Sequence, residues 1–260
     1  MRQRLGDLRT GMPVLRLLVR RDIKVRYADS VLGWLWSFLE PLLMSLIFYL
    51  VFTVIFRRDV GEEPYILFLL TGLLAWNWTS GSVGDAPRAL TKDKRLVGAV
   101  RLPREVWALR TVCSRGTEYL FALPVVVLFA VVFTHPPSLY ALALPLAFII
   151  QAVLLVGLSL LLSPIGVLVT DTANIVALVL RLGFYASPIF YGLGDVPDGL
   201  RPWYALNPMA GVIDLYRAAW FPEAFSGWGS VATSGGIAVL ALVLGVVVFA
   251  RLERAALKEL

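Results

Sequence analysis

The sequence has little charge for its length. Charged residues make up 16% of the 260 residues, whereas hydrophobic residues make up 58%. A soluble domain has about a quarter charged residues and about half apolar ones. This shortage of charge, together with a mean hydropathy of +0.77, predicts an all-α integral membrane protein rather than a soluble domain.

Cysteine and histidine are almost absent. The single cysteine, Cys113, excludes an internal disulfide, and there is no Cys-x-x-Cys pair for metal or redox chemistry. The single histidine, His135, lies beside two prolines in a predicted loop. Because membrane-embedded catalysis needs clustered nucleophiles, acids and bases, we expect no catalytic residues, no metal site and no enzyme activity in this chain.

The chain also lacks a phosphate-binding loop of the form G-x-x-x-x-G-K-[ST]. Ser234-Gly235-Gly236 opens an apolar run without the rest of a nucleotide-binding signature, so we expect no nucleotide contact there. If ATP drives this protein, hydrolysis takes place in a separate chain. No cofactor is therefore expected here, and ATP and Mg would belong to that partner.

Residues 1–29 are predicted to form a separate N-terminal helix on the inner membrane surface. Their longest uninterrupted apolar run is residues 17–19, so we expect no cleaved signal peptide. An apolar face at helical spacing lies opposite a charged stripe of Arg16, Arg20 and Lys24. Such a helix is an interfacial anchor, or additionally a docking site for a cytoplasmic partner. Asp22 and Arg26 are four residues apart and could pair.

Residues 30–260 are predicted to form one transmembrane domain with six spans, each long enough for a core of about 30 Å. The expected spans are residues 31–56, 64–83, 111–133 and 139–169, one that starts after Asp171 and breaks at Ser187-Pro188, and 231–250. Before the last span, Asn207-Pro208 has the pattern of a helix start. The helix of about 12 residues that follows is only about 18 Å long, so we expect an interfacial or re-entrant segment on the outer side.

The basic residues are distributed unequally between the predicted loops. The predicted inner segments 1–27, 86–110 and 251–260 hold eight, seven and three Lys or Arg, and the outer segments hold four, namely Arg57, Arg58, Arg201 and Arg217. Because basic loops are retained in the cytoplasm, both termini are predicted to be cytoplasmic. The net charge of +6 then reflects loops facing anionic lipid headgroups, not nucleic acid.

Residues 86–110 form a basic island that is too long for a minimal turn between two spans. We expect a cytoplasmic partner to grip it. A basic loop that contacts only lipid headgroups would have the same composition.

Arg181 is the most informative single residue. It lies ten residues past Asp171, about 15 Å into the membrane. A charge there costs at least about 2.5–3.5 kcal/mol, so its side chain should face protein or water. Either it lines a translocation path and meets an anion such as the diphosphate of a lipid carrier, or it pairs with an acid on a neighbouring helix.

The aromatic residues near the span ends have two interpretations. Sugar rings can stack on them in a channel, or they form the aromatic belt that most membrane proteins have. We expect the belt for Trp76 and Trp78, and the channel for Tyr185 and Tyr191. We expect Glu118 to pair with Arg115 on one helix surface, without a transport role.

Five stretches together resemble one family, the permease subunits of ABC-2 type polysaccharide exporters. They are RDIKVRYADSVLGWLWSFLEPLL (21–43), PYILFLLTGLLAWNW (64–78), RLPREVWAL (101–109), FYASPIFY (184–191) and NPMAGVIDLYRAAW (207–220). The resemblance implies a homodimeric pore with two copies of a separate ATPase. It would move a lipid-linked glycan, such as O-antigen, teichoic acid or galactan, outward across the bacterial cytoplasmic membrane.

The resemblance also implies site residues. It places a coupling helix at Pro87 to about Val97, moved by the ATPase as a rigid lever. The expected coupling residues are Pro87, Arg88, Lys92, Asp93, Lys94 and Arg95, with Asp22 and Arg26 from the N-terminal helix. The expected substrate path consists of Arg181, Phe184, Tyr185, Ser187, Pro188 and Tyr191.

Other functions compete with this one. An ABC-2 exporter of a drug or small lipid would share the fold, although the short outer loops favour polysaccharide. A membrane-embedded lipid-linked transferase or hydrolase would need clustered reactive side chains. An ion-coupled transporter would need internal repeats together with acids within the spans, and no such combination is found.

Overall fold

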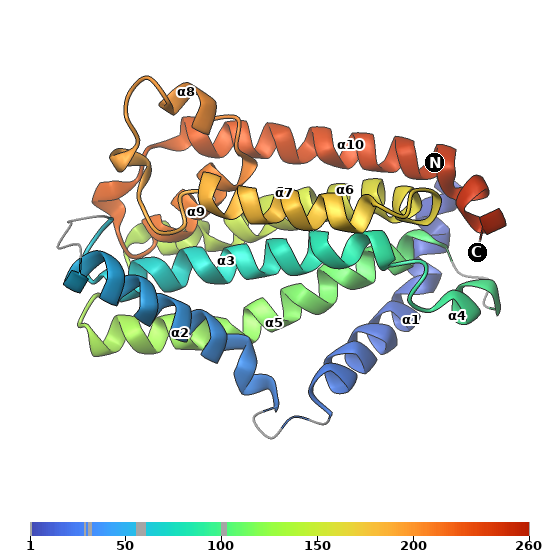
Figure 1. Cartoon of the computed structure of the whole chain (residues 1–260), viewed down its shortest axis with the longest axis horizontal. Helices are drawn as coiled ribbons and strands as arrows, with labels where there is room; N and C mark the ends of the chain where they lie inside the picture. Colours follow the sequence, from blue (N-terminus) through green and yellow to red (C-terminus); the bar gives the residue numbers. More distant parts are fainter. Residues whose placement is uncertain (1, 29, 31–32, 56–60, 100–102, 260) are drawn as a thin grey trace.

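The computed structural model describes residues 2–28, 30, 33–55, 61–99 and 103–259, and within them every regular element is helical (Figure 1). The main helices in chain order are α1 (Arg2–Tyr27), α2 (Trp36–Tyr49), α3 (Tyr65–Asp85), α4 (Lys94–Ala99), α5 (Glu105–Val132), α6 (Leu144–Leu168), α7 (Thr172–Ala186), α8 (Arg201–Tyr204), α9 (Pro208–Ala218) and α10 (Trp228–Glu259). Shorter helical segments are η1 (Gly33–Leu35), η2 (Leu50–Ile55), η3 (Ala86–Arg88), η4 (Leu139–Ala143), η5 (Leu193–Asp195) and η6 (Pro222–Ala224). The predicted all-α class is confirmed.

Five helical stretches in the described chain are long and apolar enough to cross a membrane: Phe38–Ile55, Tyr65–Arg88, Glu105–Val132, Leu139–Leu168 and Trp228–Glu259. The predicted fifth of six spans is shorter than expected. It is α7, an apolar helix of 15 residues, which is about 22 Å long and falls short of a 30 Å core. The helix ends at Ala186, so the expected break at Ser187-Pro188 is confirmed.

Some sequence-based boundaries shift in the structure. The third span begins at Glu105, not at residue 111, so the end of the basic island is helical and carries Arg110 into the bundle. The last helix continues from Trp228 to Glu259 and includes the predicted tail. Arg57, Arg58 and the junctions at residues 31 and 56 lie outside the described residues.

Helices α6 and α10 lie side by side along the bundle (Figure 1). Their close approach depends on glycine, because a Cβ on Gly157 would overlap the backbone of Ala241 and Leu242. A Cβ on Gly245 would in turn overlap the backbone of Gly157. Small residues let two helix backbones pack closely within a membrane. This pair therefore forms a rigid side of the bundle.

Helix α3 occupies the centre of the bundle, in contact with α2, α5, α6, α7 and α9. Most of its side chains are buried, including Leu67 and Ala75 at 0% exposure. Trp76 and Trp78 belong to the same core. The Trp78 ring stacks on Phe148, and its Nε1 donates to the Val112 carbonyl at 3.1 Å. The expected membrane-interface belt at Trp76 and Trp78 is therefore wrong, because protein surrounds both rings.

Helix α1 is inclined to the bundle and packs on α5 (Figure 1). Its Leu15 and Leu18 are buried against Val97 and Trp107, in one apolar cluster. The opposite stripe of Arg16, Arg20 and Lys24 is exposed, as its spacing predicts. The apolar face thus contacts protein and not only lipid.

At the other end, α9 is buried on all sides. Asn207 is its N-cap and accepts a hydrogen bond from the Met209 amide at 2.9 Å, with Pro208 in the first turn. Every residue from Met209 to Ala218 is buried. The predicted short helix is confirmed, enclosed in protein where its ends can be satisfied. The start of α1, the end of α10 and α4 lie together at the opposite end of the bundle (Figure 1).

The α6–α10 contact can be tested by overpacking. We expect Gly157→Val to destabilise the bundle by about 1–3 kcal/mol, because the added side chain must separate two backbones. The measurement is the thermal unfolding midpoint of the detergent-purified protein. Gly236→Ala is the matched control, since a Cβ there meets no atom within 4 Å. Equal midpoints for the two variants would contradict the close approach.

Candidate functional site

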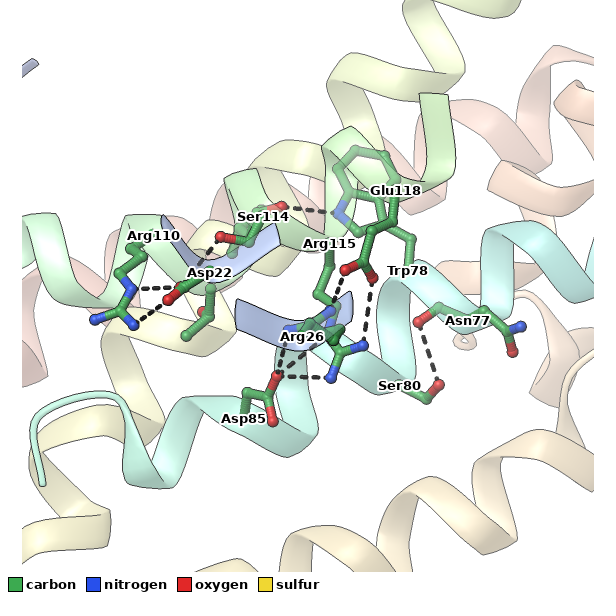
Figure 2. A network of polar contacts seen from close by, with 12 residues as sticks. Asp22, Arg26, Asn77, Trp78, Ser80, Asp85, Arg110, Ser114, Arg115 and Glu118 are labelled. Carbon is green, nitrogen blue, oxygen red and sulfur yellow. Dashed lines mark hydrogen bonds and ion pairs between the residues drawn. The ribbon is translucent and has the colours of Figure 1, made fainter. Parts of the chain in front are cut away.

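A network of ion pairs joins α1, α5 and the segment between α3 and α4 (Figure 2). Arg110 on α5 donates through Nε and Nη2 to the Asp22 carboxylate on α1, and through Nη1 to Asp93. Arg21 also donates to Asp93, at 2.7 Å. Arg110 is almost fully buried, with 4% of its side chain exposed. One buried guanidinium therefore holds three separate parts of the chain together.

A second group of charges lies beside the first. Arg26 on α1 pairs with Glu118 on α5, and Arg115 pairs with Asp85 at the end of α3, at 2.8 Å. Arg115 also reaches Glu118 at 3.4 Å, which confirms the predicted pair. The predicted pairing of Asp22 with Arg26 is wrong, because each finds a partner on another helix. In total four arginines face four acids: Arg21, Arg26, Arg110 and Arg115, with Asp22, Asp85, Asp93 and Glu118.

The balance of charge explains why the network is tolerated inside the bundle. Removing ions from water is costly unless each is paired and hydrogen-bonded. Burial alone would raise the pKa of Asp93, but hydrogen bonds and positive charge from Arg110 and Arg21 outweigh it, and the pKa lies below its ordinary value. Asp93 therefore stays ionised and bound at neutral pH.

The expected coupling helix at residues 87–97 is two short helical segments, η3 and α4, joined by turns. Its residues have two orientations. Pro87 is buried and Asp93 points into the ion network, whereas Arg88, Lys92, Lys94 and Arg95 are exposed. The segment also rests on α6, where a Cβ on Gly166 would overlap the backbone of Pro87. One side of the segment thus contacts the bundle, and its other side is exposed.

Arg181 lines a cavity of about 380 Å³ between α2, α3 and α7. Its wall also includes Phe184 and Tyr185, two other residues of the expected substrate path, and Glu40 on α2. Within the described chain Arg181 has no ion pair or hydrogen bond. The described residues therefore include no acid that pairs with Arg181, which was one of the two expected roles. Its side chain lines the cavity instead.

The remaining expected path residues lie elsewhere. Ser187 and Pro188 are buried in protein, where Ser187 Oγ accepts from Asn207 at 2.9 Å. Tyr191 lies farther out, with its hydroxyl 2.6 Å from that of Tyr204. The structure therefore brings Arg181, Phe184 and Tyr185 together around one cavity, which the other three do not line. Tyr191 still contacts this group, because its hydroxyl donates to the Tyr185 carbonyl at 3.2 Å.

Arg217 has a role that its sequence position did not indicate. It was counted among the outer charges, but it is buried on α9. Its guanidinium donates to the carbonyls of Pro188, at 2.6 Å, and of Ile189, and lies 3.4 Å from the centre of the Phe68 ring. Carbonyls freed where a helix is interrupted need donors when water is absent. Arg217 supplies them and fixes the chain after α7.

Several of these residues carried a signal in the sequence. Glu40 is a carboxylate inside the first apolar run, so the argument applied to Arg181 also applies to it. Arg217 is a lone cation in an apolar helix too short to span. The sequence did not distinguish Arg110 from its neighbours, because it is the last of seven Lys or Arg residues in the basic island 86–110.

Comparisons with known proteins point in one direction. The profile of the ABC-2 type transporter family matches residues 13–221. The O-antigen export system permease protein RfbA of Myxococcus xanthus is 32% identical over 206 residues, which is 78% of each chain. The RfbA protein of Klebsiella pneumoniae is 32% identical over 205 residues, again 78% of each. The polysialic acid transport protein KpsM of Escherichia coli is 24% identical over 258 residues, 96% of this chain and 98% of KpsM.

The ion network predicts a large effect of one substitution. Arg110→Gln leaves two buried carboxylates without their main partner, so we expect a loss of about 3–5 kcal/mol in stability. The measurement is the thermal unfolding midpoint in detergent. Arg16→Gln, on the exposed stripe of α1, is the matched control. Adding Asp22→Asn and Asp93→Asn to Arg110→Gln should recover part of the loss. If Arg110→Gln and Arg16→Gln melt alike, the network does not hold the fold.

Proposed function

Because the chain belongs to the ABC-2 type transporter family, we propose that it is the permease subunit of a polysaccharide exporter. In this function it moves a lipid-linked glycan outward across a bacterial inner membrane, with both termini in the cytoplasm. The observation that supports a polysaccharide cargo is the 32% identity to O-antigen export permeases over 78% of both chains. The cavity around Arg181 supports it, because a glycan needs a polar path.

An ABC transporter permease works with an ATPase partner, which holds ATP and Mg. The surface that fits this partner is the exposed side of the segment between α3 and α4. Its four exposed cations lie opposite the side that is bound to α1, α5 and α6. A push on this surface is therefore transmitted through Asp93 and Pro87 to the bundle. Contact with the ATPase on this surface and with the substrate in the path therefore shifts the permease between inward- and outward-facing states.

We further propose that two copies form the pore. Helix α7 exposes a continuous apolar face, with Val179, Leu182 and Tyr185 at 60–62% exposure. Helix α2 exposes Leu43 and Ile47 beside it. The cavity between these helices holds two charged side chains, which should not face lipid. A second copy set against α2 and α7 would enclose the cavity and complete the path, giving a homodimer with two ATPase subunits.

The coupling surface is tested by neutralising its exposed cations. We expect the combined variant R88S/K92S/K94S/R95S to fold normally, because none of these side chains is buried. It should lose co-purification with the ATPase subunit, or lose at least about 90% of the ATPase activity of the complex. The matched control R16S/R20S/K24S removes exposed charge from α1. Full co-purification and full ATPase activity of the coupling variant would contradict the assignment.

The cargo is tested by depletion in the native host. We expect depletion of this chain to remove polysaccharide from the cell surface and to raise the lipid-linked glycan on the cytoplasmic side. The measurement is glycan immunoblotting of the cell surface and of spheroplast extracts. Unchanged surface glycan, with accumulation of a small lipid or drug instead, would assign the chain to another branch of the family.

A further inference from the structure

The cavity that contains Arg181 also contains a carboxylate, Glu40. We propose that this cavity is a subsite for uncharged sugar units of the exported chain, and that Glu40 is its specificity-determining hydrogen-bond acceptor. This inference rests on the proposed export function and names which part of the cargo the cavity takes. The alternative part is the diphosphate that joins glycan to lipid.

The charge of the cavity distinguishes these two occupants. Its wall holds one guanidinium, Arg181, and one carboxylate, Glu40. An ionised carboxylate accepts hydrogen bonds and donates none, and it repels another anion. A diphosphate only accepts hydrogen bonds and is best bound by donors alone. Glu40 therefore makes the cavity unfavourable for a diphosphate and nearly neutral as a whole.

The hydrogen-bonding groups of the wall match sugar hydroxyls. A hydroxyl both donates and accepts, and it must keep both kinds of partner when it leaves water. Glu40 accepts, Arg181 donates, and the Asn77 amide can do both. The Ser80 hydroxyl donates to the Asn77 carbonyl at 3.4 Å and can still accept. The rings of Trp76 and Tyr185 complete the wall with apolar faces for the C–H side of a sugar.

These polar groups are available to a ligand. In the part of the chain that the structure describes, the side chains of Glu40, Asn77 and Arg181 have no ion pair or hydrogen bond. Figure 2 shows the Asn77 amide directed away from the charge network of α1 and α5. Polar groups on membrane helices that lack a protein partner need water or a ligand.

A second polar space adjoins this cavity. Glu40, Asn77 and Ser80 line a neighbouring cavity of about 330 Å³, whose other walls include Arg26, Arg115 and Glu118. The three shared residues thus form a common wall between the ion network and Arg181.

At its outer end this crevice is closed by aromatic rings. Phe48 on α2 stacks with Phe190 at 5.7 Å between ring centres and contacts Phe184 of α7 at 6.2 Å. The helices α2 and α7 are thereby joined beyond the cavity. Glu40 and Arg181 lie on the inner side of this aromatic closure, where the chain in transit would be held.

The first experiment identifies the part of the cargo in the cavity. A photo-crosslinking amino acid replaces Met44, which lines the cavity, in cells that export the native glycan. Ile47 on the same helix, 53% exposed and outside the cavity wall, is the matched control position. Leu180 gives a second cavity position on α7. After irradiation, mild acid cleaves the bond between glycan and lipid diphosphate, and the adduct is stained for sugar.

We expect adducts at positions 44 and 180 to retain sugar after acid treatment, at least about five times more than at position 47. Adducts that retain only lipid would show that the diphosphate end occupies the cavity and would overturn the inference. Absence of adducts at both cavity positions, while export continues, would overturn it as well. Failure of the export function itself appears separately, as unchanged surface glycan on depletion.

The second experiment tests the role of Glu40. We expect Glu40→Ala to lower export and the sugar-bearing adduct at position 44 about tenfold, with normal assembly with the ATPase subunit. Glu40→Gln should retain most export, since the amide oxygen still accepts a hydrogen bond. Glu62→Ala, an exposed acid outside the cavity, is the control. A Glu40→Gln variant as defective as Glu40→Ala would show that charge is required and would contradict the acceptor role.

Discussion

The pairing of one buried arginine with two carboxylates organises the end of the molecule where α1, α5 and the segment before α4 meet. Arg110 lies within a membrane-spanning helix, yet it binds Asp22 of α1 and Asp93 of the segment before α4. Each of these groups would be costly to bury alone, so the three elements must remain together. Since Asp93 belongs to the segment that carries the exposed cations, the same contact connects the inner surface of the protein to its membrane bundle.

Two other close contacts connect this network with the rest of the bundle. Gly166 lets Pro87 rest on α6, and Gly157 lets α6 pack directly on α10. At the opposite end Arg217 binds the carbonyls that follow α7. Close contacts thus fix both ends of the bundle, and α2 and α7, which have few buried residues, lie on either side of α3. This arrangement favours movement of α2 and α7 as the event that opens the path.

Hydropathy and helix-start patterns were sufficient to predict much of the fold. Five spans, the break at Ser187-Pro188 and the cap at Asn207 follow from local chemistry that neighbouring helices do not change. Span length was less predictable for α7, because the helix ends at Ala186 and Arg217 supplies donors to the carbonyls that follow it. Trp76 and Trp78 look like interface residues in sequence, and only their packing against Phe184 and Phe148 shows that they are core.

The candidate site was less accessible from sequence, because it is made by pairs that lie far apart along the chain. Asp22 and Arg110 are separated by 88 residues, so the nearer Arg26 was the partner that spacing suggested. Arg181 was predicted to be a site residue because a charge within the membrane is costly unless it faces protein or water. Its neighbours Glu40 and Asn77 come from other helices, and no spacing rule places them around one cavity.

The central claim is that α1 and the coupling segment move as one body while α2 and α7 separate. It is tested most directly by distances between spin labels in the assembled transporter, with Cys113 replaced by serine. One pair is placed at Arg16 and Lys92, the other at Ile47 and Val179, all exposed in the single chain, and only one of the two copies is labelled. On addition of a non-hydrolysable ATP analogue, the account predicts an unchanged Arg16–Lys92 distance and a longer Ile47–Val179 distance. A changed Arg16–Lys92 distance with a constant Ile47–Val179 distance would contradict it.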